Sequence, residues 1–207
     1  IYYLSIMRLN QKGEGRSFVD LDEVTKALEN KDISLHTKIL ARISDFASNN
    51  KIVETTPGRM ILAAVLPKNK HIDFSIINKT LTKKEVSNII DTVYRFCGQK
   101  ETVMFADKIM AIGFKYAALA GISFGKDDLI VPEQKQALIE STQKKVQEYE
   151  NQYQDGLITQ GEKYNKVVDA WSDCTNRVAD KMLETISKPE DDKPINSVYM
   201  MAHSGAR

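Results

Sequence analysis

The sequence predicts an α+β fold that is predominantly helical, with strands confined to a small N-terminal part. Apolar residues alternate at period two over 33–43, recur at the helical period over 82–121, and follow heptad spacing over 132–188. The change of period along the chain predicts four segments. These are a mixed α/β segment over 1–67, a helical base over 68–131, an antiparallel coiled-coil hairpin over 132–188, and a linker with a return segment over 189–207.

The composition is that of an ordinary globular chain. Among 207 residues, 42% are hydrophobic and 28% charged, and 29 basic against 28 acidic side chains leave a net charge of +1, which argues against a stand-alone nucleic-acid binder. Cys97 and Cys174 form no CxxC pair, so we expect two small buried apolar side chains rather than a zinc site or a disulfide. Apolar runs stay short of the roughly 20 residues that span a membrane, so we expect a cytoplasmic protein without a membrane segment.

In the first third, acidic residues open a short predicted helix over 20–32, and a half-buried strand follows over 33–43. His36 falls on the face of this strand opposite the apolar residues, so we expect it to be exposed. "SNNK" at 48–51 indicates a turn and "KIVET" a returning strand, which together predict a hairpin. "TTPGRMILAAVLP" is ambiguous, because Thr56-Pro57 could cap a short helix and Ile61 to Leu66 could equally form a buried strand.

The middle of the chain predicts two helices. Thr82 precedes Glu85 by three residues, the spacing of a capping box, and Gly98 suits the left-handed position that ends a helix. The second helix, over 101–121, carries small residues that permit close packing against neighbours: Ala111, Gly113, Ala117, Ala118 and Ala120.

Heptad spacing then predicts a hairpin of two helices. Pro132 suits a first helical position, the loop "QDGLIT" separates the helices, and Thr159 with Glu162 predicts a second capping box. About 21 residues per helix give an arm on the order of 30 Å, which we expect to project into solvent. "SKPEDDKP" over 187–194 reads as a surface linker. The contact line between the helices is predicted to consist of Ile139, Thr142, Val146, Tyr149 and Tyr153 facing Tyr164, Val168, Trp171, Thr175, Val178 and Met182.

The usual catalytic patterns are missing from the sequence. It has no P-loop, no Gly-rich dinucleotide turn and no GxSxG, and its three histidines, His36, His71 and His203, have no metal-ligand spacing. Asp127 and Asp128 are interpreted as solvated acids in a loop that approaches a helix. These observations predict a scaffold with a projecting arm and no self-contained active site.

Five long strings resemble the β′ subunit of bacterial DNA-directed RNA polymerase, in the same order and at similar spacing across essentially the whole chain. They are "IYYLSIMRLNQKGEG", "TTPGRMIL", "TVMFADKIMAIGFKYAALAGISFGKDDLIVPE", "GLITQGEKYNKVVDAW" and "NSVYMMAHSGAR".

The resemblance implies pore and funnel domains that line the secondary channel, through which nucleoside triphosphates enter and the 3′ end of backtracked RNA leaves. The hairpin would form the rim helices on which transcript-cleavage factors and other coiled-coil regulators dock. The implied partners are the β, α, ω and sigma subunits, with DNA and RNA bound in the assembled enzyme. The chain would be a fragment, inactive by itself, because the "NADFDGD" magnesium motif is absent from it and the Mg²⁺ and Zn²⁺ of the parent enzyme bind outside it.

The resemblance also assigns residues. Arg207 matches the arginine that contacts the triphosphate of the incoming nucleotide, a role suited to a permanently charged fork. The positions of factor docking are matched by Tyr164, Asn165, Lys166 and Asp169, and two members of a guanosine tetraphosphate site shared with ω are matched by Lys100 and Asp107.

Three residues depart from the family pattern: Ala111 replaces a tyrosine of the tetraphosphate site, His203 replaces an aspartate, and Lys163 replaces an arginine. Loss of the tyrosine removes stacking and counts against that ligand. Two alternatives carry less support from the sequence. Composition alone fits a free-standing coiled-coil hairpin adaptor without catalysis, and no constellation of residues supports an independent small enzyme.

Overall fold

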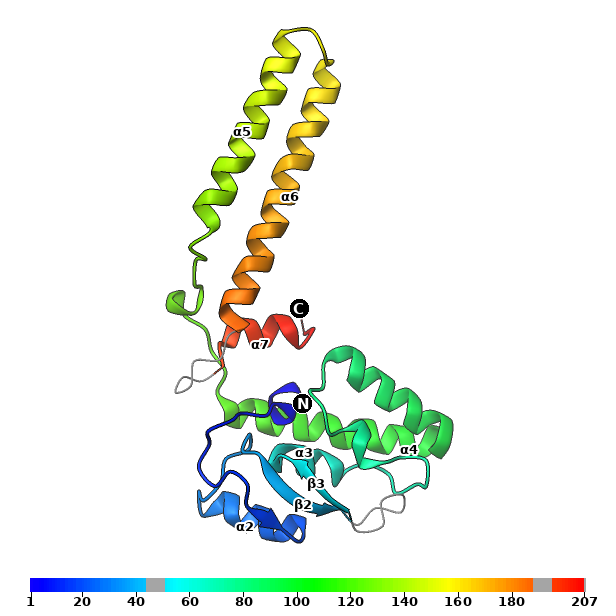
Figure 1. The fold of residues 1–207 in the computed structure, drawn as a ribbon. Helices are drawn as coiled ribbons and strands as arrows, with labels where there is room; N and C mark the ends of the chain where they lie inside the picture. The colour runs from blue at the N-terminus through cyan, green and yellow to red at the C-terminus, as the bar shows by residue number, and fades with distance from the viewer. Residues whose placement is uncertain (44–50, 188–194, 207) are drawn as a thin grey trace. The chain divides into compact units, whose positions relative to one another are not determined.

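The structure is a computed structural model that describes residues 1–43, 51–187 and 195–206. The chain divides into two compact units, Ile1–Ser123 with Met200–Arg207, and Phe124–Tyr199. The described chain is mainly helical with a small N-terminal sheet, which confirms the predicted fold class (Figure 1). The predicted division into four segments stays a prediction.

The sheet of the first unit has three strands in the order β1-β2-β3. β1 (Ser17–Phe18) pairs in parallel with β2 (Ile39–Ile43), and β2 pairs antiparallel with β3 (Lys51–Thr55), so the predicted hairpin is confirmed. Its predicted turn lies outside the described residues. The predicted strand over 33–43 is too long, because the Ser34 amide donates to Thr37 Oγ1 at 2.9 Å and folds that stretch into a turn.

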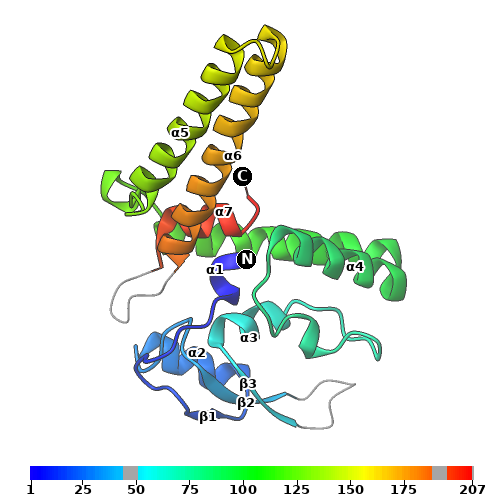
Figure 2. The same ribbon diagram turned by 45° about the horizontal axis from the view of Figure 1, so that its top comes forward.

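Three short helices belong to the same unit: α1 (Tyr2–Ser5), α2 (Leu21–Glu29) and α3 (Pro57–Ala63), and Figure 2 shows them from a second direction. α2 and α3 pack on the sheet, and α1 packs on α3. α2 begins where predicted, and the Asp20 carboxylate accepts the Glu23 amide at 2.8 Å. α3 decides the ambiguous stretch in favour of a helix, with Thr56 Oγ1 accepting the Arg59 amide at 3.3 Å. An apolar cluster including Phe18, Val24, Ile39, Met60 and Phe74 fills the space between sheet and helices.

α1 and α3 are in backbone contact. A Cβ added at Gly58 would lie 2.2 Å from the Leu4 carbonyl oxygen, so no larger residue fits there. Arg59, next to it, is buried; its Nε donates to the Ser5 carbonyl at 2.9 Å and its Nη1 to Asn78 Oδ1 at 3.1 Å. Burial lowers the pKa of the Arg59 guanidinium, and these hydrogen bonds compensate part of the cost of burying its charge.

His36 is a correction to the sequence prediction, because it is buried rather than exposed. Its Nδ1 lies 3.3 Å from the Ile6 carbonyl oxygen, and the Tyr3 ring packs edge-on against it with centroids 4.5 Å apart. Burial is the main cause that lowers the pKa of His36; the hydrogen bond to Ile6 opposes it and the Arg8 charge adds to it. The turn at 34–37 brings His36 inward where a continuous strand would have pointed it outward.

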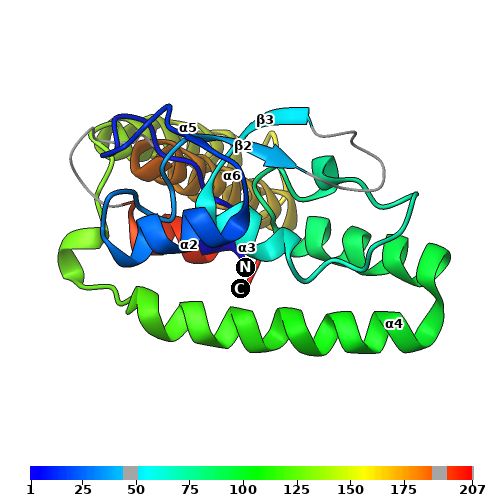
Figure 3. The same ribbon diagram turned by 90° about the horizontal axis from the view of Figure 1, so that it is seen from below.

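A short 3-10 helix, η1 (Phe74–Ile76), leads to α4 (Lys83–Ala120), which is two helical segments rather than one. Gly98 interrupts it with φ 81° and ψ 176°, and Figure 3 shows the chain turning back there. The prediction of two helices separated at Gly98 is therefore confirmed, although ψ is extended rather than left-handed helical. Ile89 and Val93 before the break and Phe105 after it belong to one core cluster.

The capping box predicted at the start of α4 is wrong. Among the described residues, Thr82 makes no side-chain hydrogen bond to the helix, and the Glu85 carboxylate pairs instead with Lys79. The Lys83 amide, one of the free donors at this helix end, is taken by the Ser204 carbonyl at 2.9 Å. A backbone group from the far end of the sequence thus replaces the expected side-chain cap.

The sequence predicts that the small residues of the second segment of α4 pack closely against neighbours, but not all of them do. A Cβ at Gly113 would lie 3.7 Å from Ile1, but Ala111, Ala117 and Ala118 are exposed. Large apolar side chains on the same segment are also exposed, among them Val103, Met110 and Phe114. This face is therefore not part of the core of its own unit.

The second unit is built around α5 (Lys135–Gln154) and α6 (Gln160–Ser187), which run antiparallel side by side (Figures 1 and 2). It also contains η2 (Lys126–Asp128) and the start of α7 (Ser197–His203). Pro132 is not the first helical residue: it is buried in a turn in which its carbonyl accepts the Lys135 amide at 3.0 Å, three residues before α5 begins. The predicted linker over 187–194 lies almost wholly outside the described residues. No helix in the described ranges is long and apolar enough to cross a membrane.

Candidate functional site

The tip of the α5–α6 hairpin is fixed by the capping box that the sequence predicts. The Thr159 amide donates to Glu162 Oε2 at 2.8 Å, and the Glu162 amide donates to Thr159 Oγ1 at 3.3 Å. The Thr159 hydroxyl also donates to Glu162 Oε2 at 3.0 Å. These hydrogen bonds from the Thr159 backbone and side chain lower the pKa of Glu162, and the Lys166 charge adds to the effect. The first turn of α6, which directly precedes the predicted docking residues, therefore starts from a defined position.

The contact line on α5 agrees with the prediction. Thr142 is buried, Ile139, Val146 and Tyr149 are partly buried, and Tyr153 lies at the edge with 37% of its surface exposed.

The contact line on α6 is wrong by one residue. The side chains that face α5 are Lys163, Val167, Ala170 and Cys174, each one position before those predicted. Val178 and Met182, further along α6, are partly buried as predicted. Cys174 is buried and its Sγ lies 3.8 Å from the Leu138 carbonyl oxygen, which confirms the predicted burial of this cysteine. Cys97, the other cysteine, is partly buried.

Two neighbouring apolar lines at heptad spacing lie on α6, and the sequence prediction selects the line with the larger residues. In the structure, the line with the smaller Ala170 and Cys174 faces α5, where Cys174 Sγ meets the Leu138 carbonyl oxygen. Heptad period alone cannot separate two adjacent lines.

Lys163 completes this contact with a polar group. Its ammonium nitrogen lies 2.8 Å from Glu150 Oε2 and 4.4 Å from the centroid of the Tyr153 ring, both on α5. Lys163 thus joins the two helices near their tip through an ion pair and a cation–π contact.

The one-residue shift turns a second apolar line outward. Tyr164 is 68% exposed, Val168 47% and Trp171 38%, and their spacing of four and three places them on one face of α6. We call these three residues the outer stripe. Val168 and Trp171 are not among the residues predicted to function. Their heptad spacing is the available signal, but the same spacing also predicts a helix contact.

The predicted docking residues are all exposed, but they do not form one cluster. Asn165 and Asp169, four residues apart, share the outward face of α6 beside the outer stripe. Lys166 lies on the opposite flank, where its ammonium nitrogen is 5.4 Å from the centroid of the Tyr149 ring on α5. Lys166 and Asp169 lie outside the contact line, as predicted.

Lys100 and Asp107 are both exposed on the second segment of α4. Their separation of seven residues, with Ala111 four further on, places all three on one face of the helix, about 10 Å from the first to the second. In the described ranges neither charged side chain has an ion-pair partner. Ala111 presents only a methyl group on this face.

Arg207 lies outside the described residues. The residues before it belong to the first unit, where the turn Ser204–Ala206 ends α7 and lies against the start of α4.

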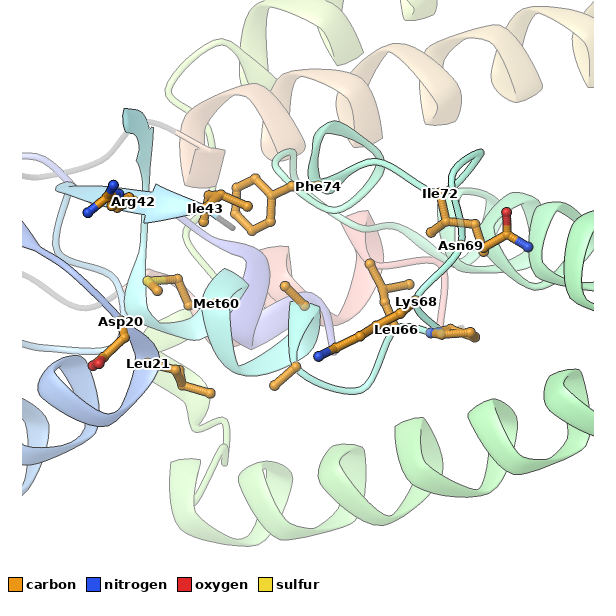
Figure 4. Close-up of a pocket in the computed structure, with 13 residues that line it drawn as sticks. Asp20, Leu21, Arg42, Ile43, Met60, Leu66, Lys68, Asn69, Ile72 and Phe74 are labelled. Atoms are coloured by element: carbon orange, nitrogen blue, oxygen red, sulfur yellow. The ribbon is translucent and has the colours of Figure 1, made fainter. Parts of the chain in front are cut away.

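An open pocket of about 480 Å³ lies elsewhere in the first unit. Figure 4 shows Arg42 and Asp20 at one end, Lys68 and Asn69 at the other, and apolar side chains such as Met60 between them. Its lining includes none of the predicted site residues. The described part of the chain contains no group of three or more His, Cys, Asp or Glu side chains that could hold a metal ion.

Two protein-family models match the chain. RNA polymerase Rpb1, domain 3, matches residues 1–129, and RNA polymerase Rpb1, domain 4, matches residues 158–207. The first match includes Lys100 and Asp107, and the second includes the exposed residues of α6 together with Arg207. Residues 130–157, which contain all of α5 and the start of the hairpin loop, lie between the two matches.

Proposed function

The chain belongs to the family of RNA polymerase largest subunits, of which it carries domains 3 and 4, and from this premise we propose that it is the secondary-channel part of a bacterial β′ subunit. In this role it forms a wall of the channel through which nucleotides enter and backtracked RNA leaves. Its partners are the other polymerase subunits, and it works in the cytoplasm on the nucleoid. The long strings that resemble β′ support this proposal over a free-standing adaptor.

The hairpin is the docking arm for transcript-cleavage and other coiled-coil factors. The N-terminal turns of α6 support this role, because hydrogen bonds and an ion pair fix their position while their side chains remain accessible. The capping box and the Lys163–Glu150 pair hold the tip, while the outer stripe, Asn165 and Asp169 are exposed beside one another. Exposed aromatic side chains flanked by polar groups are typical of protein interaction sites.

Two further roles follow from the resemblance. Arg207 contacts the triphosphate of the incoming nucleotide, while the chain by itself holds no catalytic metal and does not polymerise RNA. Guanosine tetraphosphate binds weakly if at all at Lys100 and Asp107, because Ala111 leaves the base without a stacking partner.

The observation that carries the docking role is the exposure of Asp169 and its neighbours on a matched family segment, and substitutions there test it. In the assembled polymerase, we expect Asp169→Ala and Lys166→Glu each to weaken binding of a transcript-cleavage factor about three- to tenfold, since the first removes a charge beside the outer stripe and the second reverses a charge on the flank of α6 that meets Tyr149. Factor affinity is measured by titrating factor-stimulated RNA cleavage, and factor-independent elongation on the same preparations is the reference.

Asp180→Ala is the matched control. Asp180 is an exposed acid on the same helix, about three turns beyond Asp169, and its removal is expected to leave factor affinity unchanged. Equal affinity for the Asp169→Ala enzyme and the unmodified enzyme would remove the docking role from this face of α6.

A further inference from the structure

The open pocket of the first unit has an apolar floor. Four side chains that are at most 7% exposed line it, from β2, α3, the loop after α3 and η1: Ile43, Met60, Ile72 and Phe74. All four also belong to the core clusters of this unit, so the folded core fixes their positions. The pocket is therefore preformed, and its volume of about 480 Å³ is that of a small-molecule site.

Two cations flank this floor. Figure 4 shows Arg42 at one end of the pocket and Lys68 at the other, and both side chains are exposed. Within the described ranges, neither of them has an ion-pair partner. Their charges are therefore free to meet a ligand that enters the pocket.

The other polar groups of the lining are already engaged in the fold. Asp20, at the same end as Arg42, caps α2: its Oδ1 accepts the Glu23 amide at 2.8 Å, and the described residues show no ion pair between Asp20 and Arg42. Asn69, at the other end, hydrogen-bonds to two backbone groups through its side-chain amide. Two cations against one carboxylate leave the lining with a net positive charge.

We propose that this pocket binds a small apolar diacid, whose flat hydrocarbon body lies on the apolar floor and whose two carboxylates meet Arg42 and Lys68. Burial of the apolar body drives binding, and the two cations select acids over neutral molecules of the same shape. The planar fork of Arg42 fits a carboxylate, while Lys68 supplies a point charge on a flexible stem. The inference does not depend on the docking role of the hairpin, because the pocket shares no residue with α6.

A photoreactive diacid, benzophenone-4,4′-dicarboxylate, tests the proposal in polymerase assembled with the full-length subunit. On illumination its ketone inserts into nearby C–H bonds, so mass spectrometry of the digested subunit reports where the probe was bound. We expect saturable labelling within residues 60–72, and competition by the unreactive diacid 2,6-naphthalenedicarboxylate. The neutral probe 4,4′-bis(hydroxymethyl)benzophenone has the same body without the charges, and it should label this segment about tenfold less at equal concentration.

Variants of the lining decide which groups hold the probe. Arg42→Gln and Lys68→Gln should each weaken its binding about three- to tenfold, since each removes one charged contact with a carboxylate. Ala64→Phe, which adds a ring to the lining from an exposed position, should abolish saturable labelling. Asp20→Asn keeps an N-cap residue and removes the negative charge beside Arg42, so it should strengthen binding about twofold or more. Arg95→Gln is the matched control, because Arg95 is an exposed arginine of the same unit outside the lining.

Three results would overturn the proposal. The first is the absence of labelling within residues 60–72, or equal labelling by the acidic and the neutral probe. The second is labelling that persists in the Ala64→Phe enzyme, and the third is an equal loss for Arg42→Gln and Arg95→Gln, which would mean that the probe responds only to surface charge. Factor-independent elongation by each variant shows that it is folded. Should a lining variant fail to assemble, Asp20→Asn still decides, because only a site at this end of the pocket predicts a gain in binding.

Discussion

Single residues in "TTPGR" determine how the first unit is assembled. Thr56 caps α3, Pro57 fills its first position, Gly58 admits the Leu4 carbonyl, and Arg59 binds the Ser5 carbonyl. The sequence predicts the cap and the proline, because those roles depend on local spacing. It does not predict the roles of Gly58 and Arg59, because these depend on a helix more than fifty positions away along the chain.

Gly58→Ala is expected to destabilise the 207-residue chain by about 2–3 kcal/mol, since the new methyl group would overlap the Leu4 carbonyl oxygen and separate α1 from α3. Urea unfolding followed by circular dichroism measures this change. Gly161→Ala is the control: nothing lies within 4 Å of its Cβ position in α6, so a gain of about 0.5 kcal/mol is expected there. Equal unfolding midpoints for the Gly58→Ala chain and the unmodified chain would contradict the backbone contact.

His36 makes stability depend on pH. Because burial lowers its pKa in the folded state below the ordinary 6.5, the unfolded chain binds more protons as the pH falls through that value, and the free energy of unfolding decreases. The loss continues until the pH reaches the lowered pKa. His36→Asn cannot gain a proton, and its amide can still donate to the Ile6 carbonyl. We therefore expect the free energy of unfolding of this variant, relative to that of the unmodified chain, to rise as the pH falls from about 7.5 to about 5.5.

Urea unfolding of both chains across this pH range provides the test. The difference between them cancels the contributions of other titrating groups, such as Glu162. Parallel stability curves for the two chains would show that His36 does not carry the effect.

The elements show both the strength and the limit of periodicity. Helix existence, the break at Gly98 and the contact line on α5 follow from spacing, and the structure agrees. The contact line on α6 does not follow, because Val167 and Val168 are equally apolar neighbours and spacing accommodates either. The packing of the whole helix pair decides which valine meets α5, and the spacing on α6 does not contain that information. For the same reason, the outer stripe could not be recognised as exposed from α6 alone.

The corrected register predicts different effects for adjacent valines. Val167→Ala should destabilise the hairpin by about 1–2 kcal/mol, because Val167 packs partly buried against α5. Val168→Ala should change its stability by less than about 0.5 kcal/mol, because Val168 is 47% exposed. Trp171, the single tryptophan of the chain, lies one turn away and reports unfolding by its fluorescence. A larger loss of stability for Val168→Ala than for Val167→Ala would contradict the observed register and favour the one predicted from the sequence.

At the scale of the whole molecule, the first unit is discontinuous in sequence. Ile1–Ser123 and Met200–Arg207 form one compact unit, and Phe124–Tyr199 lies between them along the chain. Heptad spacing identified the hairpin, but nothing in the spacing indicated that the last residues rejoin the first helix. That contact depends on Tyr2 with His203 and on Lys83 with Ser204, pairs that only the folded chain brings together.

The hydrogen bond from Lys83 to Ser204 closes the first unit on both sides of the inserted stretch. The hairpin is therefore an insertion in the sequence of a unit that is closed by its own contacts. Both helices can be lengthened by whole heptads, or the tip exchanged for another, without a change to any residue of the first unit. Among relatives, we accordingly expect more sequence diversity at the tip of the hairpin than in the first unit.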